Sequence, residues 1–342
     1  MDDGPSHSSV ESSILTGPTV VAPHRRAWWD FLHTRLERPL WRFRERFRAP
    51  AWTSSLRFHL LLFALTGLST VTVGAGIALN YSRRLPPFNF DFLSVFLWQH
   101  PDRIALGLPF SGALLGILLA HELGHYLACR YYGLRASYPY FIPAPTLIGT
   151  LGAFIRIRSP IINRRVLFDV AVAGPIAGFV LAVPLLAFAI LHSRVGSVPM
   201  VPDSITFGRP LALTLLIDLL RPGVSPAVLS LTPVGCAAWV GLFATALNLL
   251  PMSQLDGGHI LYALFGRKHR TFSRAFWLAL LPLGYFSWPG WFLWAAIIAL
   301  IGVGHPPVLL PSDAFGRRRK ALAVVAAAMF VLCFMPTPFI VH

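Results

Sequence analysis

Apolar stretches long enough to cross a membrane alternate with short polar segments along most of the chain. They cover residues 56–80, 104–129, 166–191, 227–250 and 321–340, and a longer stretch, 272–310, is interrupted by Trp288-Pro289-Gly290. About 20 apolar residues cross the hydrocarbon core of a bilayer, and proline with glycine interrupts a helix. The pattern therefore predicts an all-α polytopic membrane protein with about six to seven transmembrane helices.

One segment, about 138–159, departs from this pattern. Its first part contains several prolines, which are incompatible with a helix, and residues 149–158 end in an alternation of apolar and basic residues. Non-helical backbone near a membrane is tolerated only where it lines protein or water. We expect a small membrane-associated β-element here, formed by a re-entrant loop with a short strand or hairpin.

The charged residues leave the predicted helices unchanged and indicate how the protein is oriented in the membrane. Charged residues make up 13% of the chain, against about 25% in a soluble domain. The net charge is +15, but most of the 29 Lys and Arg fall at 25–57, 130–165, 267–274 and 317–320, between the apolar stretches. A nucleic-acid binder would gather them on one soluble domain, so we expect no nucleic-acid partner. The positive-inside rule predicts a cytoplasmic N-terminus for this integral, multi-pass protein. The membrane we expect is the bacterial plasma membrane, with an organelle as the alternative.

Three regions follow from these patterns. Residues 1–23 are polar and rich in serine, which predicts a disordered tail. Residues 24–55 are basic and aromatic, as in an amphipathic segment lying on an anionic bilayer surface. Residues 56–342 form the membrane domain, with a core at 104–260.

The sequence His121-Glu122-Leu123-Gly124-His125 lies inside the apolar stretch 104–129. Ionisable side chains at membrane depth are costly, so their presence there indicates a functional site. On a helix this spacing places two imidazoles on one face beside a carboxylate, the arrangement that metalloproteases use for zinc and a general base. We expect one Zn²⁺ per chain, with His121 and His125 as ligands and Glu122 as the catalytic residue.

A catalytic zinc usually needs a third protein ligand and one open position. The acids available in the apolar part, besides Glu122, are Asp169, Asp218 and Asp256. Asp256 stands out because two glycines follow it, and glycine permits close approach and unusual backbone angles. A carboxylate at Asp256 could therefore reach a metal held on a neighbouring helix. We expect Asp169 to pair with Arg164 or Arg165 instead. A fourth protein ligand would close the position needed for water, so we expect His259 to lie beside a metal ligand or at the membrane–water interface.

Together, the His121–His125 motif and Asn248-x-x-Pro251-x-x-x-Leu255-Asp256-Gly257-Gly258-His259 resemble the site-2 protease family of intramembrane zinc metallopeptidases, peptidase family M50. The similarity covers about 104–260 and includes Asn163-Arg164-Arg165 and Gly174-Pro175-Ile176-Ala177-Gly178. The small residues four apart in the latter favour close helix packing.

The resemblance implies that residues 56–342 form an intramembrane metalloprotease domain, with zinc held by His121, His125 and Asp256 and with Glu122 as acid and base. It also implies regulated intramembrane proteolysis of transmembrane protein substrates, often after a first cut elsewhere. Asn248 would hold the substrate, and the segment containing Gly149, Thr150, Leu151 and Gly152 would pair with its unwound strand.

Two other functions remain open at this stage. A divalent-metal transporter or a catalytically silent membrane scaffold could use the same polar residues, although a transporter should show a broken-helix repeat, and none is visible. Residues 193–226 are too few for an ordinary domain. We therefore expect no PDZ-type regulatory domain in the chain, and partners limited to transmembrane substrates and the lipid bilayer.

Overall fold

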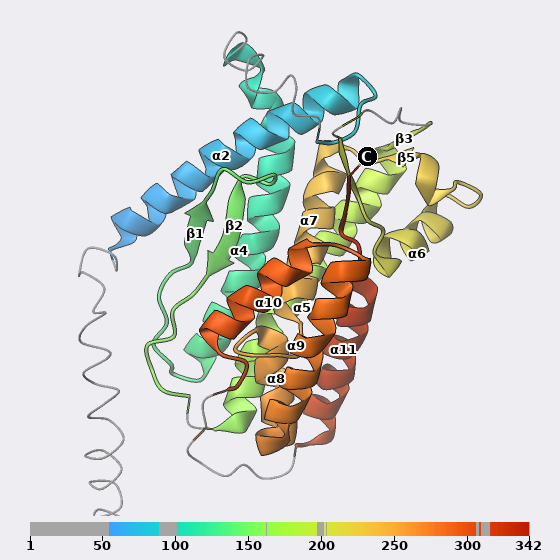
Figure 1. The fold of residues 1–342 in the computed structure, drawn as a ribbon. Coiled ribbons are helices and arrows are strands. Elements are labelled where there is room, and N and C mark those ends of the chain that lie inside the picture. The colour runs from blue at the N-terminus through green and yellow to red at the C-terminus, as the bar shows by residue number, and fades with distance from the viewer. Residues whose placement is uncertain are drawn as a thin grey trace, which may run out of the picture. The chain divides into compact units, whose positions relative to one another are not determined.

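Apolar helices pack around α4 and α5, and a two-stranded hairpin lies beside them (Figure 1). The computed structural model describes residues 55–88, 101–161, 163–196, 202, 204–305, 308 and 315–341. The predicted tail, 1–23, and all but the last residue of the predicted interfacial segment, 24–55, lie outside these residues. The helices are α2 Leu56–Ser82, a 3-10 helix Pro101–Gly107, α4 Leu108–Tyr131, α5 Arg164–His192, α6 Leu211–Leu220, α7 Pro233–Asn248, α8 Asp256–Phe265, α9 His269–Phe286, α10 Gly290–Ile301 and α11 Arg317–Cys333. The strands are β1 Tyr140–Pro143, β2 Thr150–Phe154, β3 Arg194–Val195, β4 Ile205–Phe207, β5 Leu229–Ser230 and β6 Phe339–Val341.

Side-chain caps set where the principal helices begin. Ser55, Asn163 and Thr232 each accept a hydrogen bond from a backbone N–H two or three residues later, at the starts of α2, α5 and α7. Such caps satisfy N–H groups that have no partner within the helix. In α7 a proline also occupies the first helical position, where its fixed φ favours helix formation.

Three helices of the described chain are long and apolar enough to cross a membrane: Leu56–Ser82, Asp102–Tyr131 and Arg164–His192. The predicted count of six to seven spans is therefore not confirmed. The predicted span at 227–250 contains only a 16-residue helix, because the cap and proline start α7 at Pro233, after a 3-10 turn and β5. The predicted break at Trp288-Pro289-Gly290 is confirmed, since α9 ends at Phe286 and α10 begins at Gly290.

The predicted β-element at 138–159 is an antiparallel hairpin. Tyr140 of β1 pairs with Phe154 of β2, and Phe141 pairs with Ala153. The hairpin lies between α2 and α4, with β1 packed against α2 and β2 against α4 (Figure 1). Two other pairs, β3 with β5 and β4 with β6, were not predicted; their strands have only two or three residues, too few for an alternating pattern.

Helix α4 lies inside the bundle, packed against α2, α5 and α7. Its buried residues Phe110, Leu114 and Ile117 belong to the main hydrophobic cluster. Because this face of α4 is buried, polar side chains on it must find their hydrogen-bond partners within the protein.

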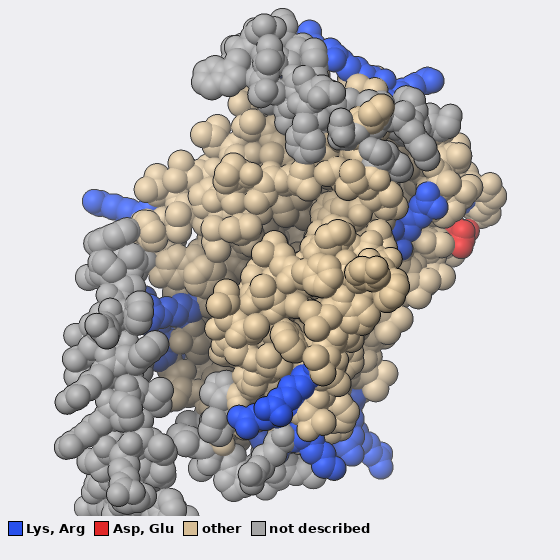
Figure 2. Space-filling view, in the orientation of Figure 1, with Lys and Arg blue, Asp and Glu red and all other residues tan. Residues whose placement is uncertain are grey.

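In the face shown in Figure 2, Lys and Arg lie mainly toward the margins, around a broad uncharged region.

Asp169 has a partner that was not predicted. Its carboxylate pairs with Arg319 of α11, 2.6 Å away, and accepts a hydrogen bond from the Tyr132 hydroxyl. The hydrogen bonds that the Arg319 guanidinium donates to Asp169 raise the pKa of Arg319 above its usual value. The expected pairing with Arg164 or Arg165 is wrong for Arg164, because its guanidinium donates instead to the Ala263 and Leu264 carbonyls at the end of α8.

Candidate metal centre

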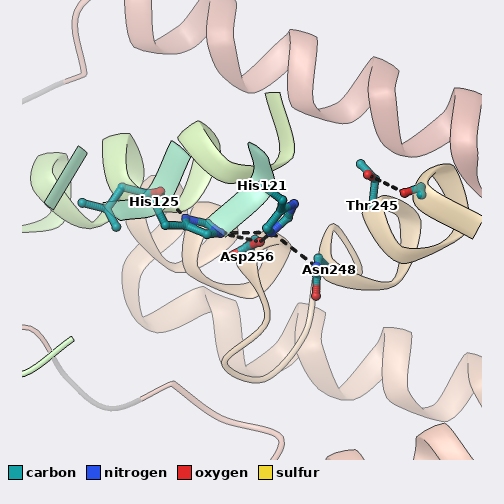
Figure 3. A network of polar contacts seen from close by, with 7 residues as sticks. His121, His125, Thr245, Asn248 and Asp256 are labelled. Atoms are coloured by element: carbon teal, nitrogen blue, oxygen red, sulfur yellow. Dashed lines mark hydrogen bonds and ion pairs between the residues drawn. The ribbon is translucent and has the colours of Figure 1, made fainter. Parts of the chain in front are cut away.

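His121 and His125 lie one turn apart on the buried face of α4. Their exposed fractions are only 6% and 8%, although the helix around them is apolar. Four residues separate them, so both rings project from the same side of the helix. Figure 3 shows the two imidazoles directed at Asp256, with Asn248 beside His121.

Asp256 reaches the histidines because α8 begins at this residue. The loop after α7 turns the chain back, and Leu255 is the N-cap of α8. A Cβ at Gly257 would lie 2.1 Å from the Leu249 carbonyl oxygen, and one at Gly258 would lie 2.4 Å from that of Ser253. The close approach expected of these glycines is therefore confirmed. Unusual backbone angles are not, since neither glycine has a positive φ.

The three side chains form a small triangle of ligand atoms. His121 Nε2 and His125 Nε2 lie 3.1 Å apart, and the Asp256 Oδ2 atom lies 3.2 Å from the first and 3.3 Å from the second. A tetrahedral zinc site with bonds of about 2.0–2.1 Å has neighbouring ligands about 3.3–3.4 Å apart. Within the described residues, this is the one group of three His, Cys, Asp or Glu side chains able to hold a metal ion.

The tautomer of His125 also fits a metal ligand. Its Nδ1 lies 2.8 Å from the Val170 carbonyl oxygen of α5. A carbonyl only accepts hydrogen bonds, so Nδ1 carries a proton, and Nε2, which faces His121 and Asp256, is the nitrogen left to bind a metal. Metal-bound histidines are commonly oriented by such a bond. Two imidazole nitrogens and a carboxylate oxygen within reach of one point are ligands that zinc commonly takes, so the donor set fits zinc.

Gly174 of α5 makes room for the His125 ring. A Cβ at this position would lie 2.1 Å from His125 Nε2, far inside van der Waals contact. One turn later, a Cβ at Gly178 would lie 3.3 Å from His121 Cβ. The small residues of α5, interpreted above as a helix-packing pattern, therefore also accommodate the imidazoles.

Glu122 lies where two cavities meet. Its side chain is 5% exposed, and the backbone of Ile155, just after β2, forms a hydrogen bond with it. The cavities have volumes of about 300 and 430 Å³, and His121, Glu122, Ala153 and Asn248 line both. The larger one is apolar, with aromatic side chains from Phe243, Trp288, Trp294 and Phe339. A carboxylate, the triangle of possible metal ligands and two cavities thus come together at one place.

Comparison with known proteins decides the family. The sequence profile of Peptidase family M50 matches residues 109–287, about half of the chain. The chain belongs to peptidase family M50. This confirms the resemblance drawn from the His121–His125 and Asp256 motifs.

This M50 chain is similar to plant proteins named as probable zinc metalloproteases of the chloroplast. It is 31% identical over 271 residues to EGY2 of Arabidopsis thaliana, covering 76% of the chain and 47% of that protein. It is 32% identical over 291 residues to EGY1 of the same plant, covering 81% and 52%. The chain thus spans about half the length of these relatives. Their names support the prediction of a zinc metalloprotease and, being chloroplastic, give no support to a bacterial plasma membrane. The M50 family and the three long apolar helices support the prediction of a membrane protein.

The structure places the predicted substrate-binding residues of this M50 chain in two settings. Thr150, Leu151, Gly152 and Asn248 line the larger cavity. Gly149 instead docks the hairpin on α2: its carbonyl accepts a hydrogen bond from Ser69 Oγ, and its φ of +79° would strain another residue. Asn248 Nδ2 lies 3.4 Å from His121 Nε2, at the outer limit of hydrogen bonding.

Three residues at the candidate metal centre of this M50 chain were not found from the sequence. The Val170 carbonyl and the Ile155 backbone are main-chain groups, which leave no signature in side-chain identity. Gly174 and Gly178, four residues apart, were noticed in the sequence, but the same spacing occurs wherever two helices simply pack closely. Only the position of His125 across the interface shows what Gly174 accommodates.

Proposed function

We propose that this chain is an intramembrane zinc metalloendopeptidase that cuts transmembrane segments of protein substrates, in regulated intramembrane proteolysis. The observation that carries the proposal is the triangle of His121, His125 and Asp256 atoms, 3.1–3.3 Å apart, on the buried side of an apolar helix. Membership of the M50 family and the names of the plant relatives support it.

His121, His125 and Asp256 would hold one zinc ion, with the fourth position open to water. When bound, zinc activates water and polarises the carbonyl of the scissile bond. Glu122, beside the ligands and at the junction of the cavities, accepts a proton from the attacking water and delivers it to the leaving amine. The apolar surroundings keep bulk water away, which strengthens the electrostatic interactions within the site.

A helical substrate hides its peptide bonds, so the segment to be cut must first become extended. Strand β2 lies along the larger cavity next to Glu122 and has one partner, β1, among the described strands. We propose that Thr150, Leu151 and Gly152 add the unwound substrate as a further strand, since exposed strand edges recognise extended peptides through the main chain. The Asn248 amide, which also lines this cavity, would hold the substrate backbone.

The membrane orientation proposed here places the N-terminus and the basic segments 130–165, 267–274 and 317–320 on the cytoplasmic side. Zinc is then held near that side, because the His125 end of α4 leads directly into the first of these segments.

The test replaces Glu122 with glutamine and compares zinc content with peptide release. The variant should keep one zinc per chain, since no ligand changes, and lose about 10²–10⁴-fold in cleavage rate. Zinc is measured on purified protein, and mass spectrometry measures the membrane peptides released in cells that produce each form. His121→Ala and Asp256→Ala should lose both zinc and cleavage.

Asp218→Asn is the matched control, because it neutralises an exposed carboxylate on α6, outside both cavities. It should behave as the wild type. Equal peptide release by wild type and Glu122→Gln, or zinc flux through wild-type proteoliposomes without any cleavage, would contradict the proposed hydrolysis and favour a transporter.

A further inference from the structure

The segment Gly302–His305 follows α10 and lies outside residues 109–287, which match the family profile. It is nevertheless hydrogen-bonded to the stretch of chain that carries Asp256. The contacts come from three places: the loop between α7 and α8, helix α8 itself, and the first turns of α9.

Two buried serines make the first set of contacts. Ser253 Oγ donates to the Gly302 carbonyl at 2.7 Å, and the Ser253 N–H donates to Ser273 Oγ at 2.9 Å. Ser273 Oγ in turn donates to the Val303 carbonyl. Ser253 has a φ of +56°, a conformation that a residue with a side chain rarely adopts. Such strain persists only where the surroundings enforce it, and these bonds act directly on the strained residue.

A pair of imidazoles makes the second set. His259 Nδ1 lies 2.7 Å from His305 Nε2, and the Tyr262 ring stacks on His305 with centroids 4.1 Å apart and planes at 12°. His259 and Tyr262 lie one turn apart on α8, the helix that begins at Asp256. Burial and, after it, the neighbouring charge of His305 lower the pKa of His259 to about 4. His259 is therefore neutral at pH 7, and it shares a hydrogen bond with His305.

We infer that the Gly302–His305 segment is a clamp that positions Asp256 for metal binding, with Ser253, Ser273 and His305 as positioning residues. The inference rests on the metal centre proposed above. Asp256 is the one ligand that does not come from α4, and α8 has only 10 residues. The clamp fixes the chain on both sides of Asp256, at Ser253 before it and at His259 after it.

The position of Asp256 matters because metal–ligand distances tolerate a change of only about 0.2 Å. Removing a group that orients a metal ligand typically weakens metal binding about 10- to 100-fold. A clamp that keeps α8 in place should have an effect of this size, without contacting the metal.

The principal experiment compares Ser273→Ala with Ser193→Ala in the full chain. Ser193 is the matched control because it is also buried, donates to the Ala189 carbonyl at 2.7 Å and accepts from the Thr232 N–H at 3.2 Å. It lies just beyond the far end of α5, about 22 Å along the helix axis from Gly178. Both variants lose the same two kinds of hydrogen bond, so a merely structural role would affect both alike.

Three quantities are measured for each purified variant: the Zn²⁺ affinity by chelator competition, the visible spectrum of the Co²⁺-loaded protein, and the thermal unfolding of the metal-free protein. Ser273→Ala should bind Zn²⁺ about 10- to 100-fold more weakly and show an altered Co²⁺ spectrum. Ser193→Ala should match the wild type in both, even where the two variants unfold at similar temperatures. Equal Zn²⁺ affinity and identical Co²⁺ spectra in wild type and Ser273→Ala would overturn the clamp.

A second pair of variants keeps the test decisive if Ser273→Ala does not fold. His305→Gln retains a hydrogen-bonding group opposite His259, whereas His305→Phe retains a ring for Tyr262 and loses that bond. Zn²⁺ affinity should fall for His305→Phe and be largely restored in His305→Gln; equal affinities would overturn the clamp. A wild-type protein that binds no Zn²⁺ would refute the metal centre itself, whereas zinc-loaded variants without any defect would refute the clamp alone.

Discussion

Replacing Gly174 with alanine should remove the metal while leaving helix α5 in place. The new Cβ would lie 2.1 Å from His125 Nε2, 2.4 Å from Cδ2 and 2.5 Å from Cε1. To reach an ordinary contact of 3.4 Å, the ring must move away by about 1.3 Å. That displacement is several times the tolerance of about 0.2 Å in a metal–ligand bond.

The effects on stability and on metal binding should therefore separate. Alanine in place of glycine favours a helix by about 1 kcal/mol, and overpacking costs about 1–3 kcal/mol. The free energy of unfolding of the metal-free protein should then fall by no more than about 2 kcal/mol. Zinc affinity should fall by at least about 100-fold, because one of three ligands is displaced.

The assay is chelator competition for Zn²⁺, together with thermal unfolding of the metal-free protein. Gly112→Ala on α4 is the matched control, since nothing lies within 4 Å of its new Cβ. Gly178→Ala is intermediate, with its Cβ 3.3 Å from His121 Cβ, and should weaken binding only slightly. Wild-type zinc affinity in Gly174→Ala would refute the placement of His125 against α5.

Two further predictions concern the hairpin and the ion pair. Leu151→Pro removes a backbone N–H from β2 and should lower the cleavage rate at least about 10-fold with zinc content unchanged. The control Leu151→Ala keeps that N–H and should cleave normally. Full cleavage by the proline variant would argue against strand addition. Arg319→Met removes the ion pair with Asp169 and should lower the free energy of unfolding by about 1–3 kcal/mol. Partial exposure of both side chains, 29% and 18%, favours the lower end of that range. Zinc affinity should stay at the wild-type level, and an unchanged unfolding temperature would show that the pair does not hold α11 to α5.

The sequence predicted which three side chains the structure brings together at the candidate metal centre, because its signals are local. The spacing of His121 and His125 fixes both rings on one helical face, and the glycines after Asp256 permit the close backbone approach seen in the structure. The break between α9 and α10 was predicted for the same reason, since Pro289 and Gly290 act on their own neighbours. In each case the physical cause lies within a few residues of the feature.

Features that depend on how helices dock were predicted less well. Asp169 is paired with Arg319, 150 residues away, because α11 packs against α5 there. No local pattern carries that information, and the nearer arginines were the natural choice. The predicted span at 227–250 differs from the structure for another reason: mean hydropathy over these residues does not reveal that Thr232 and Pro233 start the helix late.

The junction of the two cavities has a consequence for the products. His121, Glu122, Ala153 and Asn248 border both spaces, so the proposed point of attack lies at their shared boundary and not at the closed end of a pocket. Under the proposed function, a polypeptide laid across that boundary would be cut with one fragment on each side. The two fragments would then occupy different cavities, so neither would have to pass the other before the next substrate enters.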